Sequence, residues 1–143
     1  MDKMSFSHHI SQQYNEELRE ILNNVMSMGG LVEQQLADAL VALVEGDNER
    51  GELVVTSDYK INAFEVRLDE ECTHVLARRQ PAASDLRLVI AVIKTITDLE
   101  RIGDEAERIG RMALHLLEAD RRRSPMEQVA ALGELVKKML HGA

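Results

Sequence analysis

The chain has 143 residues, a length typical of a single domain that can bury a core of its own. Its residues are 45% hydrophobic but only 3% aromatic, and it contains no Trp, which favours an aliphatic helical bundle over a β-sheet. A formal net charge of −8 argues against nucleic acid as a partner, because nucleic-acid-binding proteins present a basic face. The composition therefore predicts an acidic, all-α protein.

The single cysteine, Cys72, excludes an internal disulfide and is typical of a reducing compartment such as the cytoplasm. It falls on a buried step of a predicted helix, so we expect a small core residue rather than a reactive thiol. The N-terminus lacks the charged-then-apolar pattern of a signal peptide, and no run of about 18 apolar residues is present to span a bilayer. We therefore expect a soluble cytoplasmic protein that reaches a membrane only through partners.

Apolar residues recur at steps of three or four from Ile10 to Leu43, which predicts one long amphipathic helix. Ser7 or Ser11 could cap its start, and Gly46-Asp47 ends it, because glycine readily adopts positive φ. The pair Gly29-Gly30 in its middle costs roughly 1 kcal/mol per residue relative to alanine. We therefore expect close helix packing or a mild bend at these glycines.

A second helix is predicted from Asn48 to Arg78, ending before Pro81 because the residue preceding proline avoids the helical conformation. Its expected buried positions follow one stripe: Leu53, Ile61, Phe64, Leu68, Cys72 and Val75. Oxygen-bearing side chains follow a second line about 100° from the first, at steps of four, three and four: Asp58, Asn62, Glu65 and Asp69. This helix therefore presents a polar line beside its buried face.

A third helix is predicted from Pro81 or Ala82 to Asp120. One seam of this helix begins with three apolar residues and continues into polar ones: Leu86, Ile90, Ile93, Thr97, Glu100 and Asp104. Two carboxylates thus occupy positions where the pattern expects core residues. Because a buried charge is costly unless it is paired or binds a metal, we treat Glu100 and Asp104 as candidate metal ligands.

A fourth helix is predicted from Ser124-Pro125 to Leu140, after the basic run Arg121–Arg123, which we interpret as a solvated helix end. Three long helices with short turns can close an antiparallel bundle, so this fourth helix has no partner left in the chain. We infer either that the chain is a fragment or that this helix pairs with another copy. In a homodimer, the residues expected to pack against the second copy are Val129, Leu132 and Val136.

If the second and third helices form an antiparallel hairpin centred near Gln80, residues whose numbers sum to about 161 lie level, because both helices have the same rise. Gly103 would then let a backbone or a ligand approach closely. The side chains expected to converge on one patch are Asp58, Asn62, Glu65, Glu100 and Asp104, with Asp69 about one turn further away. Oxygen ligands without histidine suit Mg²⁺, Mn²⁺, Ca²⁺ or ferric iron better than zinc.

Two other interpretations of these side chains remain open. In the first, Arg101 and Arg108 pair with Glu100 and Asp104, and the chain is a metal-free helical interaction module. In the second, Glu71-Cys72-Thr73-His74 supplies the Glu-x-x-His spacing of carboxylate-bridged metal enzymes, although those proteins need two such motifs. The first predicts arginine contacts to the carboxylates, and the second predicts redox turnover or hydrolysis with bound metal.

Four segments of the chain have recognisable sequences: MSMGGLVEQQLADAL (26–40), DYKINAFEVRLDEEC (58–72), RRQPAASDLRL (78–88) and DLERIGDEAERI (98–109). Together they resemble the first repeat of the PhoU family of phosphate-signalling accessory proteins. Members of that family contain two three-helix repeats, whose acidic E/D-x-x-x-D motifs bind metal ions or clusters. The resemblance implies an antiparallel three-helix bundle over residues 5–121, and the first part of a second, truncated repeat over residues 124–143.

The resemblance also assigns metal ligands residue by residue. The firmest match is Glu100-Arg-Ile-Gly-Asp104, and Glu65-Val-Arg-Leu-Asp69 has the same form. Asp58 and Asn62 match the start of the motif on the second helix. The implied cofactor is a divalent or trivalent metal ion, Mg, Mn or Fe, without the second metal site of the family's other repeat.

Members of the family couple a phosphate ABC transporter to a membrane sensor histidine kinase, and they suppress the phosphate-starvation response when phosphate is plentiful. The resemblance therefore implies a negative regulator of phosphate uptake and two-component signalling that has no catalysis of its own. The sequence shows no phosphate-binding glycine-rich loop and no nucleophile beside a base. The alternatives are a carboxylate-bridged metal enzyme on a helical bundle and a metal-free interaction module.

Overall fold

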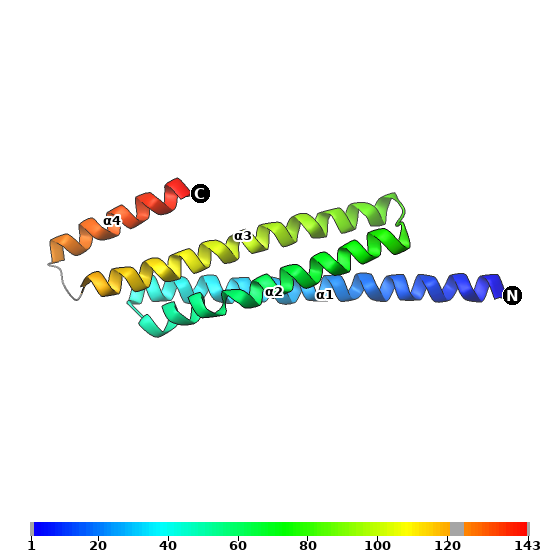
Figure 1. The fold of residues 1–143 in the computed structure, drawn as a ribbon, viewed down its shortest axis with the longest axis horizontal. Helices are drawn as coiled ribbons and strands as arrows, with labels where there is room; N and C mark the ends of the chain where they lie inside the picture. The colour runs from blue at the N-terminus through cyan, green and yellow to red at the C-terminus, as the bar shows by residue number, and fades with distance from the viewer. Residues whose placement is uncertain (1, 121–124, 143) are drawn as a thin grey trace. The chain divides into compact units, whose positions relative to one another are not determined.

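The computed structural model describes residues 2–120 and 125–142, with side chains from 12 to 120 and from 129 to 142, and apart from two turns these residues form α-helices (Figure 1). The helices are α1 (Asp2–Glu45), α2 (Asn48–Arg79), α3 (Ala83–Asp120) and α4 (Pro125–Gly142). No strand occurs among the described residues, so the all-α prediction is confirmed. None of these helices contains a segment long and apolar enough to cross a membrane.

A tight turn joins α1 to α2. α1 ends at Glu45 because Gly46 leaves the helical conformation with a φ of 70°. Asp47 then caps α2, since its side chain accepts a hydrogen bond of 3.1 Å from the backbone N–H of Arg50. The helix end predicted from Gly46-Asp47 is therefore confirmed.

A second turn joins α2 to α3. α2 ends at Arg79, and Gln80 adopts a φ of 44°, in the left-handed region that favours glycine. Pro81 follows, and the backbone N–H of Leu86 donates a hydrogen bond of 2.8 Å to the carbonyl of Ala82 at the start of α3. The prediction that α2 stops before Pro81 is confirmed.

α1 begins earlier than predicted. It starts at Asp2 rather than near Ile10, so Ser7 and Ser11 lie inside the helix and neither caps its start. Apolar residues recur at helical spacing in the sequence only from Ile10 onward, so periodicity did not indicate the earlier turns of α1. The predicted helix end at Arg121–Arg123 and the predicted cap at Ser124 lie outside the described residues.

The chain divides into two compact units, which are described separately. The first unit comprises residues 1–33 and 59–102, and the second comprises residues 34–58 and 103–143. Each unit contains segments of α1, α2 and α3, and α4 belongs to the second unit. These units differ from the division expected from the sequence, a three-helix repeat over residues 5–121 and the start of a second repeat over residues 124–143. That division into repeats stays a prediction.

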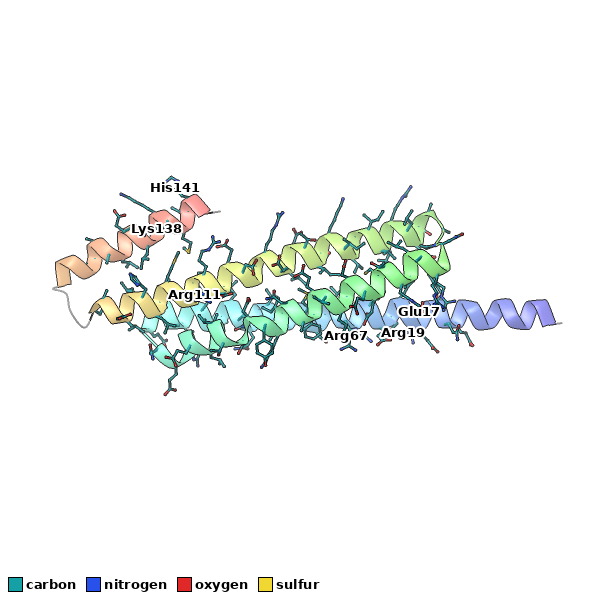
Figure 2. All side chains as sticks on the ribbon, in the orientation of Figure 1. Glu17, Arg19, Arg67, Arg111, Lys138 and His141 are labelled. Carbon is teal, nitrogen blue, oxygen red and sulfur yellow. The ribbon has the colours of Figure 1, made fainter. Side chains whose placement is uncertain are left out.

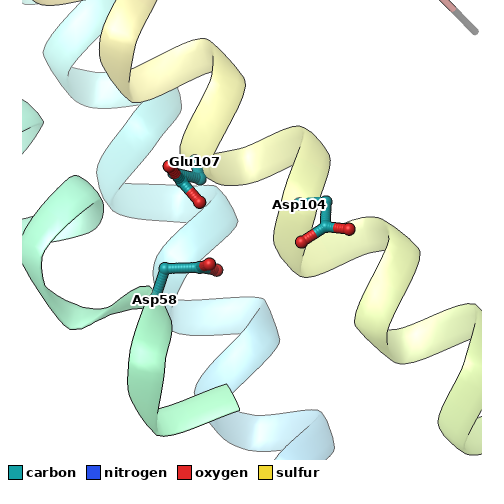
Figure 3. A group of neighbouring side chains, drawn as sticks. All are labelled: Asp58, Asp104 and Glu107. Atoms are coloured by element: carbon teal, nitrogen blue, oxygen red, sulfur yellow. The ribbon is translucent and has the colours of Figure 1, made fainter. Parts of the chain in front are cut away.

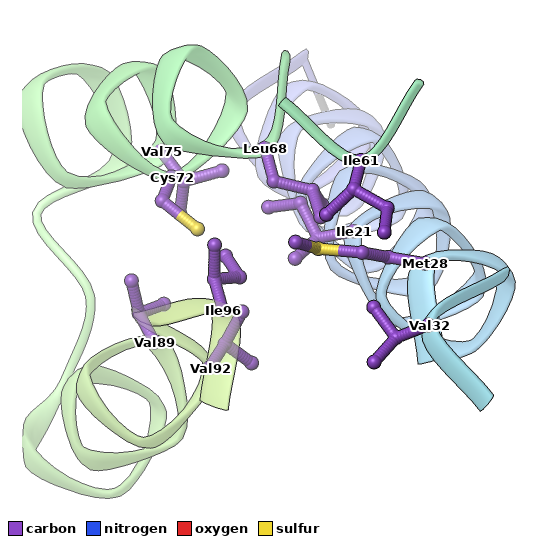
Figure 4. Close-up of a cluster of buried hydrophobic side chains, with 10 residues drawn as sticks. All are labelled: Ile21, Met28, Val32, Ile61, Leu68, Cys72, Val75, Val89, Val92 and Ile96. Carbon is purple, nitrogen blue, oxygen red and sulfur yellow. The ribbon is translucent and has the colours of Figure 1, made fainter. Parts of the chain in front are cut away.

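The core of the first unit is aliphatic and comes from three helices (Figure 4). Its buried members are Ile21, Met28, Val32, Ile61, Leu68, Cys72, Val75, Val89, Val92 and Ile96. Burying one aliphatic side chain of this kind contributes about 1.5–3 kcal/mol. Cys72 is 1% exposed, as predicted for a small core residue. Its burial raises the pKa of the thiol to about 11.

The buried face of α3 differs from the predicted one by one residue. Leu86 and Ile90, expected in the core, are 38% and 42% exposed. Val89, Val92 and Ile96 are instead 1%, 7% and 5% exposed. Both stripes are apolar in the sequence, so spacing alone did not distinguish them. The prediction that the seam of Leu86 and Ile90 faces the core is therefore wrong.

The same shift occurs in the second unit. The buried residues of α3 there are small or aliphatic: Gly103, Ala106, Ile109, Gly110 and Ala113. Asp104 thus lies beside the buried line and does not take the place of a core residue. On α2, Leu53 is 51% exposed and Val54 is 1% exposed, so the predicted burial of Leu53 is also wrong.

α4 has a partner within this chain. Met139 packs against the core of the second unit, whose buried members are Ala39, Val54, Ala106 and Ile109. The expectation of a fourth helix without a partner is therefore wrong. The residues expected at a dimer interface nevertheless remain exposed: Val129 at 71%, Leu132 at 40% and Val136 at 40%.

α2 and α3 approach each other closely in the second unit, at Gly51 and Gly110. A Cβ atom on Gly110 would lie 3.1 Å from Val54 Cγ1 and 3.4 Å from the carbonyl oxygen of Gly51. The two glycines therefore let the helix backbones meet without intervening side chains. Their residue numbers sum to 161, which confirms the predicted antiparallel register in this unit.

The glycine pair in α1 has a different environment. A Cβ atom added to Gly29 or to Gly30 would meet no atom within 4 Å outside its own helix backbone. The close helix packing expected at these glycines is therefore absent from the described residues, and both positions have room for a larger residue.

Alanine substitutions at the two kinds of glycine should change stability in opposite directions. Gly30→Ala adds a methyl group in open space and improves helix propensity, so the free energy of unfolding should rise by up to about 1 kcal/mol. Gly110→Ala should lower it by about 1–3 kcal/mol, because the helices must separate to admit the new atom. Urea unfolding followed by circular dichroism measures both changes. A stabilising Gly110→Ala substitution would show that the contact at Gly110 is not close.

Candidate metal centre

Three carboxylates come together in the second unit, Asp58 from α2 and Asp104 and Glu107 from α3 (Figure 3). One carboxylate oxygen of each residue lies within 4.8 Å of the others. Within the described part of the chain, no other group of three His, Cys, Asp or Glu side chains meets this condition. We call these residues the carboxylate cluster.

The close approach of α2 and α3 positions the carboxylate cluster. Asp58 follows Gly51 by seven residues, which is about two helical turns, and Glu107 precedes Gly110 by about one turn. Asp104 lies a further turn along α3 on the same side of the helix. Because the helices are antiparallel, two successive turns of α3 face the one turn of α2 that holds Asp58.

The members of the cluster differ in burial. Asp58 is buried, at 9% exposure, whereas Glu107 is half-buried and Asp104 is exposed. A hydrogen bond joins the carboxyl groups of Asp58 and Glu107. Two ionised carboxylates in such contact repel each other unless a proton lies between them. A bound cation can replace that proton, because it too offsets the repulsion between two carboxylates.

Glu107 also interacts with an arginine. The Nε atom of Arg111 donates a hydrogen bond of 2.7 Å to Glu107 Oε1. The hydrogen bond from Asp58, together with Arg111, holds the pKa of Glu107 below its ordinary value, although burial acts in the opposite direction. Glu107 is therefore ionised at neutral pH, and Arg111 fixes the orientation of its carboxylate.

The donor atoms of the cluster fit a hard cation. Mg²⁺ and Ca²⁺ bind oxygen at about 2.0–2.6 Å, so two oxygens around one ion lie up to about 5 Å apart. The spacing in the cluster, within 4.8 Å, meets that limit. The cluster contains no imidazole and no thiolate, so Mg²⁺, Mn²⁺, Ca²⁺ or ferric iron fits it better than zinc. Three protein ligands leave coordination positions for water or for a further ligand.

The structure brings together two of the predicted ligands, Asp58 and Asp104, and adds Glu107. Sequence reasoning missed Glu107 because it placed the buried face of α3 one residue away from the true one. The spacing of three residues between Asp104 and Glu107 puts both on one side of a helix, and this signal was available in DLERIGDEAERI.

The other predicted ligands lie in the first unit. Asn62 and Asp69 are exposed on α2, whereas Glu65 on α2 and Glu100 on α3 are half-buried. No group of three metal-binding side chains among the described residues includes any of these carboxylates. Their role as metal ligands stays a prediction.

One of the two arginines predicted to pair with Glu100 and Asp104, Arg108, has a contact with another carboxylate, and the pairing of Arg101 stays a prediction. Arg108 donates a hydrogen bond of 3.1 Å to Glu105, which lies outside the cluster. The arginine that pairs with the cluster is Arg111, through Glu107. An ion pair is therefore part of the cluster, and it holds one carboxylate in place.

The motif Glu71-Cys72-Thr73-His74 contacts α1 in the first unit. The Asn24 amide donates a hydrogen bond of 3.0 Å to Glu71, and Arg67 lies 3.3 Å from the same carboxylate. His74 Nε2 lies 3.8 Å from Glu17. Glu71 and His74 therefore join α2 to α1 through polar contacts.

Comparison with known proteins identifies relatives of this chain. The PhoU domain family matches residues 25–113, which is more than half of the chain. The phosphate-specific transport system accessory protein PhoU homolog of Pseudomonas putida is 48% identical over 143 residues, which is 100% of this chain and 56% of that protein. The phosphate-specific transport system accessory protein PhoU of Escherichia coli K12 is 44% identical over 141 residues, which is 99% of this chain and 58% of that protein.

Solved structures of the same family share the fold. The crystal structure of PhoU from Pseudomonas aeruginosa has a TM-score of 0.74 and 44% identity, over 88% of this chain and 59% of that one. The phosphate transport system regulatory protein PhoU from Streptococcus pneumoniae has a TM-score of 0.68 and 29% identity, over 89% of this chain and 61% of that one. These names describe accessory and regulatory proteins rather than enzymes. The family match, the sequence identities and the shared helical fold together show that this chain belongs to the PhoU family.

Proposed function

We propose that this chain is a non-catalytic regulatory module of phosphate uptake and phosphate-starvation signalling. Family membership is the observation that supports the proposal, because relatives at 48% and 44% identity are named accessory proteins of phosphate-specific transport systems. The chain spans 56% and 58% of the length of these relatives, and the proposal extends their role to it. The proposed partners are a phosphate ABC transporter and a sensor histidine kinase, which the chain holds inactive when phosphate is plentiful.

The proposal includes a metal ion, Mg²⁺, Mn²⁺ or ferric iron, at the carboxylate cluster. A bound ion supplies positive charge that offsets the repulsion among the carboxylates. Asp58 would bind it from α2, and Asp104 and Glu107 would bind it from α3. Arg111 holds the Glu107 carboxylate in one orientation, which lowers the entropy cost of binding. The site would then fix α2 against α3 and preserve the surface that these helices offer to partners.

Neutral variants of the cluster should lose the metal. Asp104→Asn and Glu107→Gln keep the side-chain volume and remove a charged ligand, so metal content should fall at least about tenfold. Elemental analysis after loading with Mn²⁺ and gel filtration measures this change. Metal at 100 times its Kd should also raise the stability of the wild type by about 2.7 kcal/mol, and this increase should be lost in both variants.

Matched variants on the same helix provide the controls. Glu105→Gln removes a carboxylate next to the cluster but outside it, so this variant should keep the metal content of the wild type. Glu100→Gln tests the ligand predicted in the first unit, and it should lower the metal content only if Glu100 binds metal. A wild-type protein that takes up none of Mg²⁺, Mn²⁺ and ferric iron would exclude the site.

Partner binding tests the regulatory role. The purified chain should bind the cytoplasmic part of a phosphate-responsive sensor kinase, or the ATPase subunit of a phosphate ABC transporter, both from Pseudomonas putida, as measured by calorimetry. In a P. putida strain that lacks its PhoU relative, expression of the chain should lower a phosphate-starvation reporter in phosphate-rich medium. The full-length relative is the positive control. If the chain binds neither partner while the relative does, the proposed regulatory role of the chain is wrong.

We also propose that the exposed face of α4 mediates a homodimer. This face contains apolar side chains at helical spacing that are 40% to 71% exposed: Val129, Leu132, Val136 and Leu140. A continuous apolar stripe on a helix is typical of an interaction surface. Leu132→Lys with Val136→Lys should therefore convert a dimer to a monomer in sedimentation velocity. Val44→Lys, at a position on α1 that is 82% exposed, is the matched control, and a monomeric wild type would contradict the proposal.

A further inference from the structure

A groove between α1 and α2 in the first unit has a volume of about 450 Å³. Leu31 of α1 lines one side, and the rest of the lining comes from one stretch of α2: Tyr59, Lys60, Ala63, Phe64 and Arg67. The exposed lining is mostly apolar, and no acidic residue belongs to it. We call this feature the α1–α2 groove.

The α1–α2 groove contains aromatic side chains that are scarce in this protein. The chain has two Tyr, two Phe and no Trp. One of the tyrosines, Tyr59, and one of the phenylalanines, Phe64, line the groove. Phe64 is held in place because it packs against the core of the first unit, whereas Tyr59 is 66% exposed. Aromatic residues on a rigid element are the most frequent anchors of protein partners. The pair therefore suits an inserted apolar side chain.

Two cations flank the groove. Lys60 and Arg67 lie seven residues apart on α2, which is about 10.5 Å along the helix axis. Lys60 forms no salt bridge with the described side chains. Arg67 lies 3.3 Å from Glu71 and 4.0 Å from Glu20, yet its side chain remains 60% exposed (Figure 2). The chain as a whole has a net charge of −8, but both charged residues that line this groove are cations, so the groove favours an acidic partner.

We propose that the α1–α2 groove binds an amphipathic helix of a partner protein. An aliphatic side chain of that helix enters between Leu31, Tyr59 and Phe64, and acidic side chains two turns apart face Lys60 and Arg67. This geometry matches the recognition of a helix in an apolar groove, in which anchors recur at helical spacing. The inference rests on the proposed function, in which this chain acts by binding other proteins, and it specifies one surface and the chemistry of its partner.

The neighbouring groove of the first unit does not offer the same recognition. It has a volume of about 380 Å³, and its lining is rich in carboxylates, including Glu17, Glu20 and Glu71. Arg79 donates a hydrogen bond of 2.8 Å to Glu17, and Glu71 accepts one of 3.0 Å from Asn24. The carboxylates of this groove would repel an acidic partner helix.

A second copy of the chain is a less suitable occupant of the α1–α2 groove. One exposed apolar stripe on another copy is that of α4, and Lys137 and Lys138 lie next to it in the sequence. A second copy that docks through that stripe brings its own cations toward a groove whose charged lining residues, Lys60 and Arg67, are also cations. Like charges across an interface are unfavourable, so charge complementarity favours an acidic partner helix.

The test uses two synthetic helical peptides of about 18 residues that share a leucine face. The acidic peptide has glutamates two turns apart beside that face, and the basic peptide has lysines at the same positions. Fluorescence polarisation measures their affinities for the full 143-residue chain and for its variants. The groove variants are Tyr59→Ser and Lys60→Glu, and Lys94→Glu, at an exposed position of α3, is the matched control. All substituted positions are exposed, so circular dichroism should show unchanged helicity.

We expect the wild type to bind the acidic peptide at least about tenfold more tightly than the basic one. Tyr59→Ser should weaken binding of the acidic peptide about tenfold, Lys60→Glu should abolish the preference for it, and Lys94→Glu should change neither affinity. Equal affinities for the two peptides, or acidic-peptide binding that survives both groove substitutions, would overturn the proposal. Conversion of a wild-type dimer to a monomer by Tyr59→Ser would overturn it too, because a second copy would then occupy the groove.

The same variants separate this inference from the proposed function. If the wild type binds the kinase or transporter fragment and both groove variants bind it equally well, the groove is not the partner site but the regulatory role stands. If the peptides bind as expected while the wild type binds neither fragment, the groove recognises acidic helices and the proposed partners are wrong.

Discussion

The candidate metal centre depends on the close approach of α2 and α3 at Gly51 and Gly110. Helical glycine costs about 1 kcal/mol relative to alanine, so this approach is made at the expense of helix stability. The backbones meet because neither residue has a side chain, and Gly110 lies against Val54 as well as against Gly51. Asp58 on α2 and Glu107 on α3 lie one or two turns from these glycines. The short distance between the two helix backbones therefore sets the distance between the two carboxylates. The glycines thus fix the geometry of a site to which they contribute no ligand.

Sequence reasoning predicted the order of the helices, the turns at Gly46-Asp47 and before Pro81, and the antiparallel register, because each depends on local chemistry or on helix rise alone. It did not predict which of two apolar stripes on α3 faces the core. Leu86 and Val89 are both aliphatic, and only the packing of three helices decides between faces one residue apart. That error of about 100° made Asp104 look like a replacement for a core residue and concealed Glu107. Two of the predicted ligands meet for a different reason, the approach of the helices at the glycine pair.

The two proposed binding features attract opposite charges. Three carboxylates attract a cation in the second unit, whereas Lys60 and Arg67 offer an otherwise acidic chain a place to bind an acidic protein segment in the first. Both features include residues of α2. The proposed regulator would act through such surfaces, since its effect on a partner is limited to the difference in its affinity for that partner's alternative states. The motif at Glu71 and His74 instead contacts Asn24, Arg67 and Glu17 within the chain.

Cys72 gives the first unit a built-in reporter of its own opening. It is the only thiol in the chain, it is 1% exposed, and its raised pKa keeps it protonated at neutral pH. The thiolate is the reactive species, so alkylating reagents and oxidants can reach this sulfur only when the surrounding core separates. The rate at which the folded protein is labelled therefore measures how often that core opens, and oxidative cross-linking between chains can start only from molecules that are already partly unfolded.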